Sequence, residues 1–317
     1  MRETSEVVLR VSGLRKSYGH LRAVDDLDLE VQGGEIFGFL GPNGAGKSTS
    51  LSMMCGLLRP DAGHIELLGL PLEAGCKASV RKIGIAPQDL VFWEMLTCKE
   101  QLEFVGRVYG FSCREARARA AELLAIFGLQ EKTNSLGKTL SGGMQRRLHI
   151  ALGLVHRPSM LFLDEPQAGL DPQSRVLVRE VLDSLRGSTT VILTTHDMEE
   201  AEKLCDRVCI IDRGKRLVLD TVEGLERRLG EGNRFELEID AEIENSLLPH
   251  LPHRLREAPG LAVQGKSLHF TAAEGAAMLP ELLAVVTARG LHVTHLRLRK
   301  TTLEDVFLHL TGRSLRE

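Results

Sequence analysis

The stretch GPNGAGKS at residues 41–48 decides how the first part of this chain folds. An apolar run, EIFGFLG at 35–41, leads into it and helix-compatible sequence follows, so a turn from a strand into a helix is predicted. Glycines let the backbone N–H groups of such a turn point into one concavity, and the start of the helix adds a favourable partial charge. The stretch therefore predicts a cradle for the phosphates of a nucleotide.

Individual residues of this phosphate loop have expected roles. Lys47 is expected to reach the β- and γ-phosphates, and Ser48 is expected to ligate Mg²⁺. The loop residues expected to bind the nucleotide are Gly41, Pro42, Asn43, Gly44, Ala45, Gly46, Lys47, Ser48 and Thr49.

A second motif, MLFLDEP at 160–166, places two acids where a buried strand is expected to end. Asp164 is expected to hold Mg²⁺ through its water shell. Glu165 comes one residue later and points to the other side, which makes it the candidate general base for water. Adjacent acids at a strand end are common on surfaces, so this assignment depends on the phosphate loop.

The pattern around these motifs predicts an α/β fold. Besides the run at 35–41, the stretches at 82–88, 160–166 and 189–196 are continuously apolar, as strands buried on both faces are. A largely parallel sheet covered by helices on both sides follows. The alternating LDLEV at 27–31 predicts part of an antiparallel edge, and the helical pattern between Gln88 and Ser141 predicts an all-helical insertion.

Composition sets the broad class of protein. The 317 residues are 43% hydrophobic and carry a net charge of -3, which excludes a polycation and a highly charged disordered chain. The six cysteines form no CxxC pair, which is typical of a reducing compartment. No run approaches the roughly 20 apolar residues that span a bilayer, and the start lacks the core of a signal peptide. A soluble, intracellular protein is expected.

The pattern changes near LERRLGEGNR at 225–234, where glycines and charges interrupt it. We expect a nucleotide-binding domain at 1–228, with its helical insertion at about 89–158, and a small α+β accessory domain at 229–317. In the second domain the alternation of the strand at 291–299 slips phase near His295, which predicts a bulge or an edge position there. A capping box from Thr301 to Glu304 is predicted to start the last helix.

The octet LSGGMQRR at 140–147 resembles the signature motif of ATP-binding-cassette (ABC) ATPases. Further motifs of that family follow the expected order along the chain, over residues from about 7 to 220. They are Tyr18 in an A-loop-like position, Gln88 in a Q-loop-like position, Asp171 in a D-loop-like position and His196 in an H-loop-like position. The resemblance implies a P-loop NTPase core with an antiparallel β subdomain and a helical insertion, and ATP with Mg²⁺ as its cofactors.

The resemblance also implies roles for single residues. Tyr18 would stack on adenine, and Gln88 would contact Mg²⁺ or the attacking water, which His196 would orient beside the γ-phosphate. Asp171 would link the two active sites of a dimer. Ser141, Gly142 and Gly143 would bind the nucleotide of the partner subunit, where the capped start of their helix attracts a γ-phosphate. Gln167 departs from the family, in which many relatives carry Thr or Ser, and altered packing with intact hydrolysis is expected.

Within this family the chain is similar to the ATPase subunits of ABC-2-type exporters, including drug-resistance pumps. The tail RKTTLEDVFLHLTGR at 299–313 resembles the end of their C-terminal extension. The resemblance implies a second ATPase subunit, as a homodimer or a heterodimer, and separate transmembrane permease subunits that hold the chain at the inner face of the membrane. DLVFWEMLT at 89–97, with Phe92, Trp93 and Met95, is the candidate contact, although internal packing explains Trp93 equally well.

A soluble ABC ATPase that works on nucleic acid or ribosomes is the alternative function. Relatives of that kind tend to carry coiled coils, zinc modules or two cassettes in one chain. None of these is visible in the sequence, and the near-neutral charge provides no footprint for a phosphate backbone. Transport is therefore the favoured interpretation, with no nucleic-acid partner and no direct lipid anchor expected.

Overall fold

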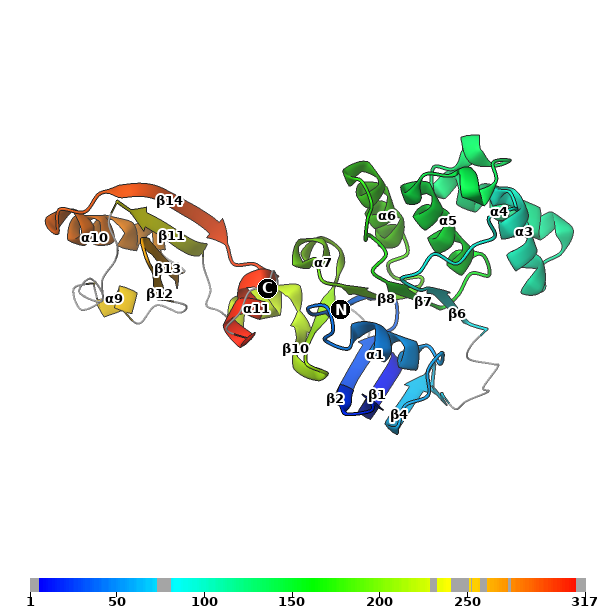
Figure 1. The fold of residues 1–317 in the computed structure, drawn as a ribbon, viewed down its shortest axis with the longest axis horizontal. Coiled ribbons are helices and arrows are strands. Elements are labelled where there is room, and N and C mark those ends of the chain that lie inside the picture. Colours follow the sequence, from blue (N-terminus) through cyan, green and yellow to red (C-terminus); the bar gives the residue numbers. More distant parts are fainter. Residues whose placement is uncertain are drawn as a thin grey trace. The chain divides into compact units, whose positions relative to one another are not determined.

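The computed structural model describes residues 6–72, 81–228, 233–240, 251, 253–256, 261–272 and 275–311. It divides into two compact units, Met1–Leu219 and Asp220–Glu317, whose elements are labelled in Figure 1. The division precedes α8 (Val222–Arg228), which the sequence pattern alone grouped with the first domain. Helix α8 falls in the second unit because it packs against α11 (Leu303–Thr311).

A six-stranded sheet forms the centre of the first unit, in the order β10-β9-β3-β8-β7-β6. The four apolar runs form β3 (Ile36–Leu40), β6 (Ile83–Ala86), β7 (Met160–Asp164) and β8 (Thr190–Thr195). Strand β3 pairs in parallel with β8 and β9 (Arg207–Asp212), and β7 pairs in parallel with β6 and β8. This confirms the α/β class, and β10 (Lys215–Thr221) completes one edge.

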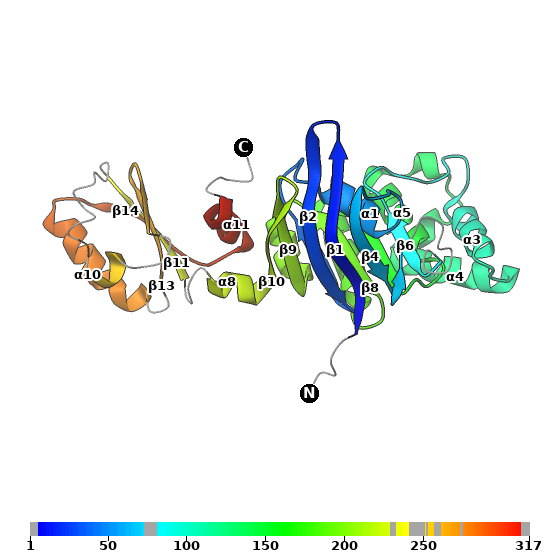
Figure 2. The same cartoon turned by 90° about the horizontal axis from the view of Figure 1, so that it is seen from below.

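A second, antiparallel sheet has the order β2-β1-β4-β5. Its strands are β1 (Val7–Tyr18), β2 (Leu21–Gln32), β4 (Ala62–Leu67) and β5 (Leu70–Pro71). The LDLEV stretch lies in β2 at the edge, as its alternation predicted. Helix α1 (Lys47–Met54) contributes Leu51 and Met53 to a core that includes strands of both sheets, and Figure 2 shows this β-layer face on.

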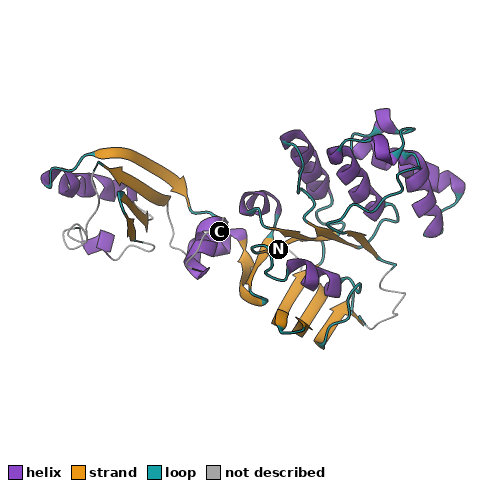
Figure 3. Cartoon of the chain, viewed as in Figure 1, coloured by secondary structure: helices purple, strands orange, loops and turns teal. Residues whose placement is uncertain are grey.

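Helices make up most of the chain between β6 and β7. They are α3 (Cys98–Val108), α4 (Cys113–Ile126) and α5 (Gly142–Leu154), with 3₁₀ turns at Gln130–Lys132 and Gly137–Thr139. Helices α3 and α4 both begin with a capping box, in which Thr97 and Glu100, or Ser112 and Glu115, satisfy each other's backbone N–H groups. Helices α6 (Pro172–Ser184) and α7 (Met198–Leu204) follow β7 and β8 (Figure 3).

The second unit is a four-stranded antiparallel sheet with helices. The order is β12-β13-β11-β14, from β11 (Asn233–Ile239), β12 (Ala262–Gln264), β13 (Ser267–Ala272) and β14 (Val293–Lys300). Helices α9 (His253–Arg256) and α10 (Gly275–Ala288) supply Leu255, Leu282 and Val286 to its core. The register of β11 against β14 shifts between His295 and Val293, which confirms the predicted irregularity.

The cap of α11 lies one residue later than predicted. Thr302 and Asp305 form it, because the Thr302 N–H donates to Asp305 Oδ2 at 3.0 Å and the Asp305 N–H donates to Thr302 Oγ1 at 3.4 Å. The Thr301–Glu304 prediction was therefore wrong in register. Asp305 is needed there because Arg234 and Arg299 from two strands also donate to its carboxylate.

Among the described residues, no helix is long and apolar enough to cross a membrane.

Candidate functional site

The phosphate loop lies between β3 and α1, as the sequence predicted. Gly46 has φ of 101°, and a Cβ atom there would lie 2.2 Å from the carbonyl oxygen of Ala23. A Cβ atom at Gly41 would lie 2.4 Å from the carbonyl oxygen of Ile211. These positions need glycine because other backbone approaches the loop closely, and at Gly46 also because of the left-handed conformation.

Lys47 is held across this loop and is 5% exposed. Its Nζ donates to the carbonyl oxygens of Gly41 at 2.8 Å and Pro42 at 3.1 Å, and lies 3.7 Å from Glu165 Oε1. Burial lowers the pKa of Lys47, although the negative charges of Glu165 and Asp164 oppose this effect. A buried ammonium group therefore lies at the loop, beside the candidate base.

The two acids at the end of β7 are fixed by the neighbouring strand. Thr194 of β8 donates its hydroxyl proton to Asp164, which is 6% exposed. The N–H of Glu165 donates to both the carbonyl oxygen and Oγ1 of Thr194, at 3.2 and 3.0 Å. Glu165 has φ of 47°, a strained conformation for a side chain larger than glycine, so these two bonds help to hold the bend that directs its carboxylate. Sequence reasoning missed Thr194.

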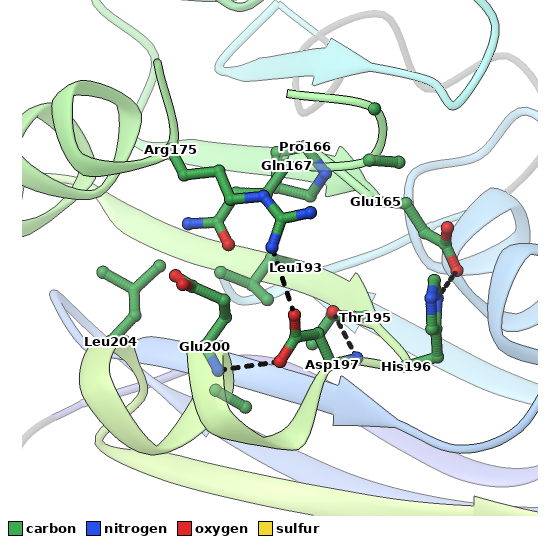
Figure 4. A pocket seen from close by; sticks show the side chains of 13 residues that line it. Glu165, Pro166, Gln167, Arg175, Leu193, Thr195, His196, Asp197, Glu200 and Leu204 are labelled. Atoms are coloured by element: carbon green, nitrogen blue, oxygen red, sulfur yellow. Dashed lines mark hydrogen bonds and ion pairs between the residues drawn. The ribbon is translucent and has the colours of Figure 1, made fainter. Parts of the chain in front are cut away.

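His196 follows β8 directly and meets the carboxylate of Glu165. Its Nδ1 lies 2.9 Å from Glu165 Oε1, and the side chain is 52% exposed (Figure 4). Glu165 thus contacts both Lys47 and His196, and the three residues come from three different segments. They meet because β3, β7 and β8 are parallel neighbours, so their carboxyl ends share one edge of the sheet.

An open cleft joins Tyr18 to part of the phosphate loop, but Gly41, Pro42 and Ala45 do not line it. It is lined by Tyr18, Leu21, Ala23, Asn43, Gly44, Gly46, Lys47, Ser48, Thr49, Gln88 and Glu165. Tyr18 is half-exposed, as a stacking platform must be, whereas Val24 is 1% exposed and packs in the core. Leu21 and Ala23 also line the cleft. The sequence analysis missed them, although the two-residue alternation of β2 places them on the face opposite the buried Val24.

The signature residues lie outside that cleft. Ser141 caps α5, with Oγ accepting from the Met144 N–H at 3.4 Å, and both Ser141 and Gly142 are exposed. A Cβ atom at Gly143 would lie 2.9 Å from Ser174 Oγ, so α5 packs tightly against the start of α6.

Asp171 also lies outside the cleft and caps α6. Its carboxylate accepts from the N–H and the hydroxyl of Ser174, at 2.9 and 2.8 Å. These bonds lower the pKa of Asp171. In this chain the carboxylate therefore stabilises the start of its own helix.

A phosphate loop with a buried lysine, an acid pair on the adjoining strand and a capped Ser-Gly-Gly helix start together define a nucleotide-hydrolysing ATPase of the cassette type. A sequence model of the family described as "ABC transporter" matches residues 24–168. A second model, described as "AAA domain, putative AbiEii toxin, Type IV TA system", matches residues 135–202.

The chain is 38% identical over 313 residues to the linearmycin resistance ATP-binding protein LnrL of Bacillus subtilis, covering 98% of this chain and 100% of that protein. It is 37% identical to the daunorubicin resistance ATP-binding protein DrrA2 of Streptomyces coeruleorubidus, covering 96% of this chain and 95% of that protein. A dimeric post-hydrolysis structure of the ATP-binding cassette MJ0796, bound to ADP and Pi, superimposes with a TM-score of 0.62 at 26% identity, covering 67% of this chain and 98% of that one. The chain belongs to the ABC transporter family as an ATP-binding subunit, and it is an ATPase.

Proposed function

We propose that this chain hydrolyses ATP to drive an ABC-2-type exporter whose transmembrane permease subunits are separate chains. The observation that carries the proposal is that similarity to resistance and export ATP-binding proteins extends over 96% or more of the chain, so it includes the second unit. The chain would lie at the inner face of the membrane, held there by its permease partner. Asp220–Glu317 would be an accessory unit of the same subunit.

The cleft supports a specific assignment of roles. Tyr18 would stack on adenine, and the backbone of residues 41–49 would bind the phosphates. Lys47 would exchange the carbonyl oxygens of Gly41 and Pro42 for phosphate oxygens, which are charged and therefore stronger acceptors. Oxygen donors from Ser48, Gln88 and Asp164 fit Mg²⁺, partly through water, and the ion would neutralise phosphate charge.

Glu165 is the proposed general base. Once Lys47 turns to the phosphates, the carboxylate is free to accept a proton from water, with His196 at 2.9 Å to hold its orientation. The exposed start of α5, with Ser141, Gly142 and Gly143, is not part of this cleft, so we propose that it completes the site of a second copy of the chain. ATP would then close a homodimer with two competent sites.

Two variants test this assignment. Glu165→Gln should abolish steady-state hydrolysis and yield an ATP-dependent dimer in size-exclusion chromatography, while Lys47→Ala should abolish high-affinity ATP binding in calorimetry. Glu199→Gln is the matched control, because Glu199 is an exposed acid that pairs with Lys203. Undiminished hydrolysis by Glu165→Gln would contradict the base assignment.

An exposed apolar surface on the helical insertion is the proposed contact with the permease. Trp93 and Met95 are 45% and 65% exposed, and Trp93 packs edge-on against Phe104 of α3 at 5.2 Å between ring centroids. Phe92 is a poorer anchor than the sequence suggested, because it is half-buried where a Cβ atom at Gly137 would touch its ring. Val108, at 65% exposed, extends the surface along α3.

The partner is tested by purifying tagged Glu165→Gln protein from detergent-solubilised membranes of its host, with ATP present. A polytopic membrane protein in about equal amount is expected, and Trp93→Ala combined with Met95→Asp should remove it without changing ATP binding. Leu57→Asp is the control, because Leu57 lies outside the helical insertion and is also 65% exposed. Recovery of ribosomes or nucleic acid in place of a membrane protein would favour the soluble alternative.

A further inference from the structure

A second pocket opens beside Glu165 and His196, on the side shown in Figure 4. Its lining comes from residues 165–169 after β7, the end of β8 up to Asp197, α7, and Arg175 of α6. The guanidinium group of Arg175 reaches across it towards Asp197, the residue that follows His196.

Asp197 holds the backbone that follows His196. Among the described residues, Glu165 is the hydrogen-bond partner of the His196 ring and no second one is present, so the ring has one polar contact. The Asp197 N–H donates to Thr195 Oγ1 at 2.9 Å, and Asp197 Oδ1 caps α7 by accepting from the Glu200 N–H at 3.1 Å. Its other carboxylate oxygen, Oδ2, lies 3.6 Å from Arg175 Nη1.

Arg175 is itself fixed to the loop that follows the acid pair. Its Nε donates to the carbonyl oxygen of Leu170 at 3.1 Å, and its backbone N–H donates to the carbonyl oxygen of Asp171 at 3.0 Å. One planar side chain thus contacts the segment that follows Glu165 and the residue that follows His196. These two segments follow Glu165 and His196, whose side chains form the carboxylate–imidazole pair.

We propose that Arg175 is a positioning residue for hydrolysis: through Asp197 it holds His196 against Glu165. The proposal rests on the roles proposed above for Glu165 and His196. Arg175 acts on the turnover step and not on ATP binding, because it contacts neither the phosphate loop nor Tyr18. Both side chains of the ion pair are 39% exposed, and pairs of this exposure contribute modestly, so the expected effect is about fivefold.

The chain contains a matched control for the simpler idea that Arg175 only ties α6 to α7. Arg179, one turn further along α6, pairs with Glu200 of α7 at 3.4 Å. It joins the same two helices without contacting Asp197. Arg179→Gln should therefore leave kcat unchanged, even if it lowers the melting temperature as much as Arg175→Gln does.

Steady-state hydrolysis is measured for Arg175→Gln, Asp197→Asn, the double variant, Arg175→Lys and Arg179→Gln in the full chain. Asn caps a helix as well as Asp does, so Asp197→Asn removes the charge and keeps the start of α7. Arg175→Gln and Asp197→Asn should each lower kcat about fivefold, while KM for ATP stays within about twofold of the value for the unmodified protein. The double variant should be no slower than the slower single one. Arg175→Lys keeps the positive charge but not the planar group, so its rate should lie between those of the unmodified protein and Arg175→Gln.

Unchanged kcat in Arg175→Gln, an equal loss in Arg179→Gln, or a loss of about 25-fold in the double variant would overturn the proposal. Glu165→Gln is run in the same assay. If Glu165→Gln is inactive while Arg175→Gln is normal, only the positioning role fails. If Glu165→Gln still hydrolyses ATP, the proposed base fails as well.

Discussion

His149 provides a test of the packing of the signature helix. It lies on α5, is 3% exposed, and its Nδ1 has no hydrogen-bond partner among the described residues. Burial, with a smaller contribution from the charge of Arg146, lowers the pKa of His149 from 6.5 to about 4. The imidazole is therefore neutral in the folded chain across the physiological range.

The sign of the pH effect follows from linkage. Below the unfolded pKa of 6.5, His149 binds a proton in the unfolded chain but not in the folded chain. The free energy of unfolding therefore falls as the pH drops from 6.5 towards about 4. The full shift corresponds to about 3 kcal/mol, and about 2 kcal/mol of it is lost by pH 5. Above about pH 7.5 His149 contributes almost no pH dependence.

The perturbation is His149→Leu, which removes the titrating group and keeps an apolar side chain of similar volume. Urea unfolding is followed by the fluorescence of Trp93, the single tryptophan of the chain, which lies in the first unit. Between pH 7.5 and pH 5 the unmodified protein should lose about 2 kcal/mol more than the variant. Because each protein is compared with itself, the packing cost of the substitution cancels.

A difference below about 0.5 kcal/mol would refute the reasoning, since it would mean that His149 is protonated in the folded chain or exposed there. Other histidines remain in both proteins. The comparison therefore isolates this side chain and not the whole acid response.

Two further predictions concern local geometry. Gly46→Ala should weaken ATP binding in calorimetry by at least about 100-fold, because its Cβ would lie 2.2 Å from the Ala23 carbonyl oxygen. A Cβ atom at Gly44 would have nothing within 4 Å, so Gly44→Ala should cost only the conformational strain of about 1–2 kcal/mol. Equal losses in both variants would contradict this account. Asp305→Ala should destabilise the second unit by about 3–5 kcal/mol, because the 1% exposed carboxylate binds Arg234 and Arg299. Amide hydrogen exchange should then speed up in β11 and β14 but not in β7. Arg297→Gln, which like Arg299 lies on β14, is the control. Unchanged exchange in Asp305→Ala would show that the contacts of Asp305 with Arg234 and Arg299 are dispensable.

Asp305 also shows why a capping motif alone does not fix the residue at which α11 begins. Burial alone would raise its pKa, but hydrogen bonds from Arg299 and Thr302 and the charges of Arg234 and Arg299 outweigh that effect and leave the pKa below its ordinary value. The tail TTLEDV contains two overlapping caps of similar quality, one starting at Thr301 and one at Thr302. The register is decided by Arg299 on β14 and by Arg234 on β11, which lies 71 residues away in the sequence.

The parts of this protein that the sequence alone determined are those with local causes. The phosphate loop, the buried strands and the helical insertion are written in consecutive residues, because glycine conformation, strand burial and helical periodicity act over a few positions. The chemical character of the nucleotide site followed from these segments together with the family resemblance.

Tertiary structure decided how those segments meet. The strand order β9-β3-β8-β7 is not the order of the sequence, so only the folded sheet places Thr194 beside Asp164, and His196 beside Glu165. The bridge from Arg175 to Asp197 depends on the same adjacency. Periodicity shows which face of a strand is buried, but it does not name the neighbouring strand. Contacts between distant segments supply that information, and they arise only when the whole core packs.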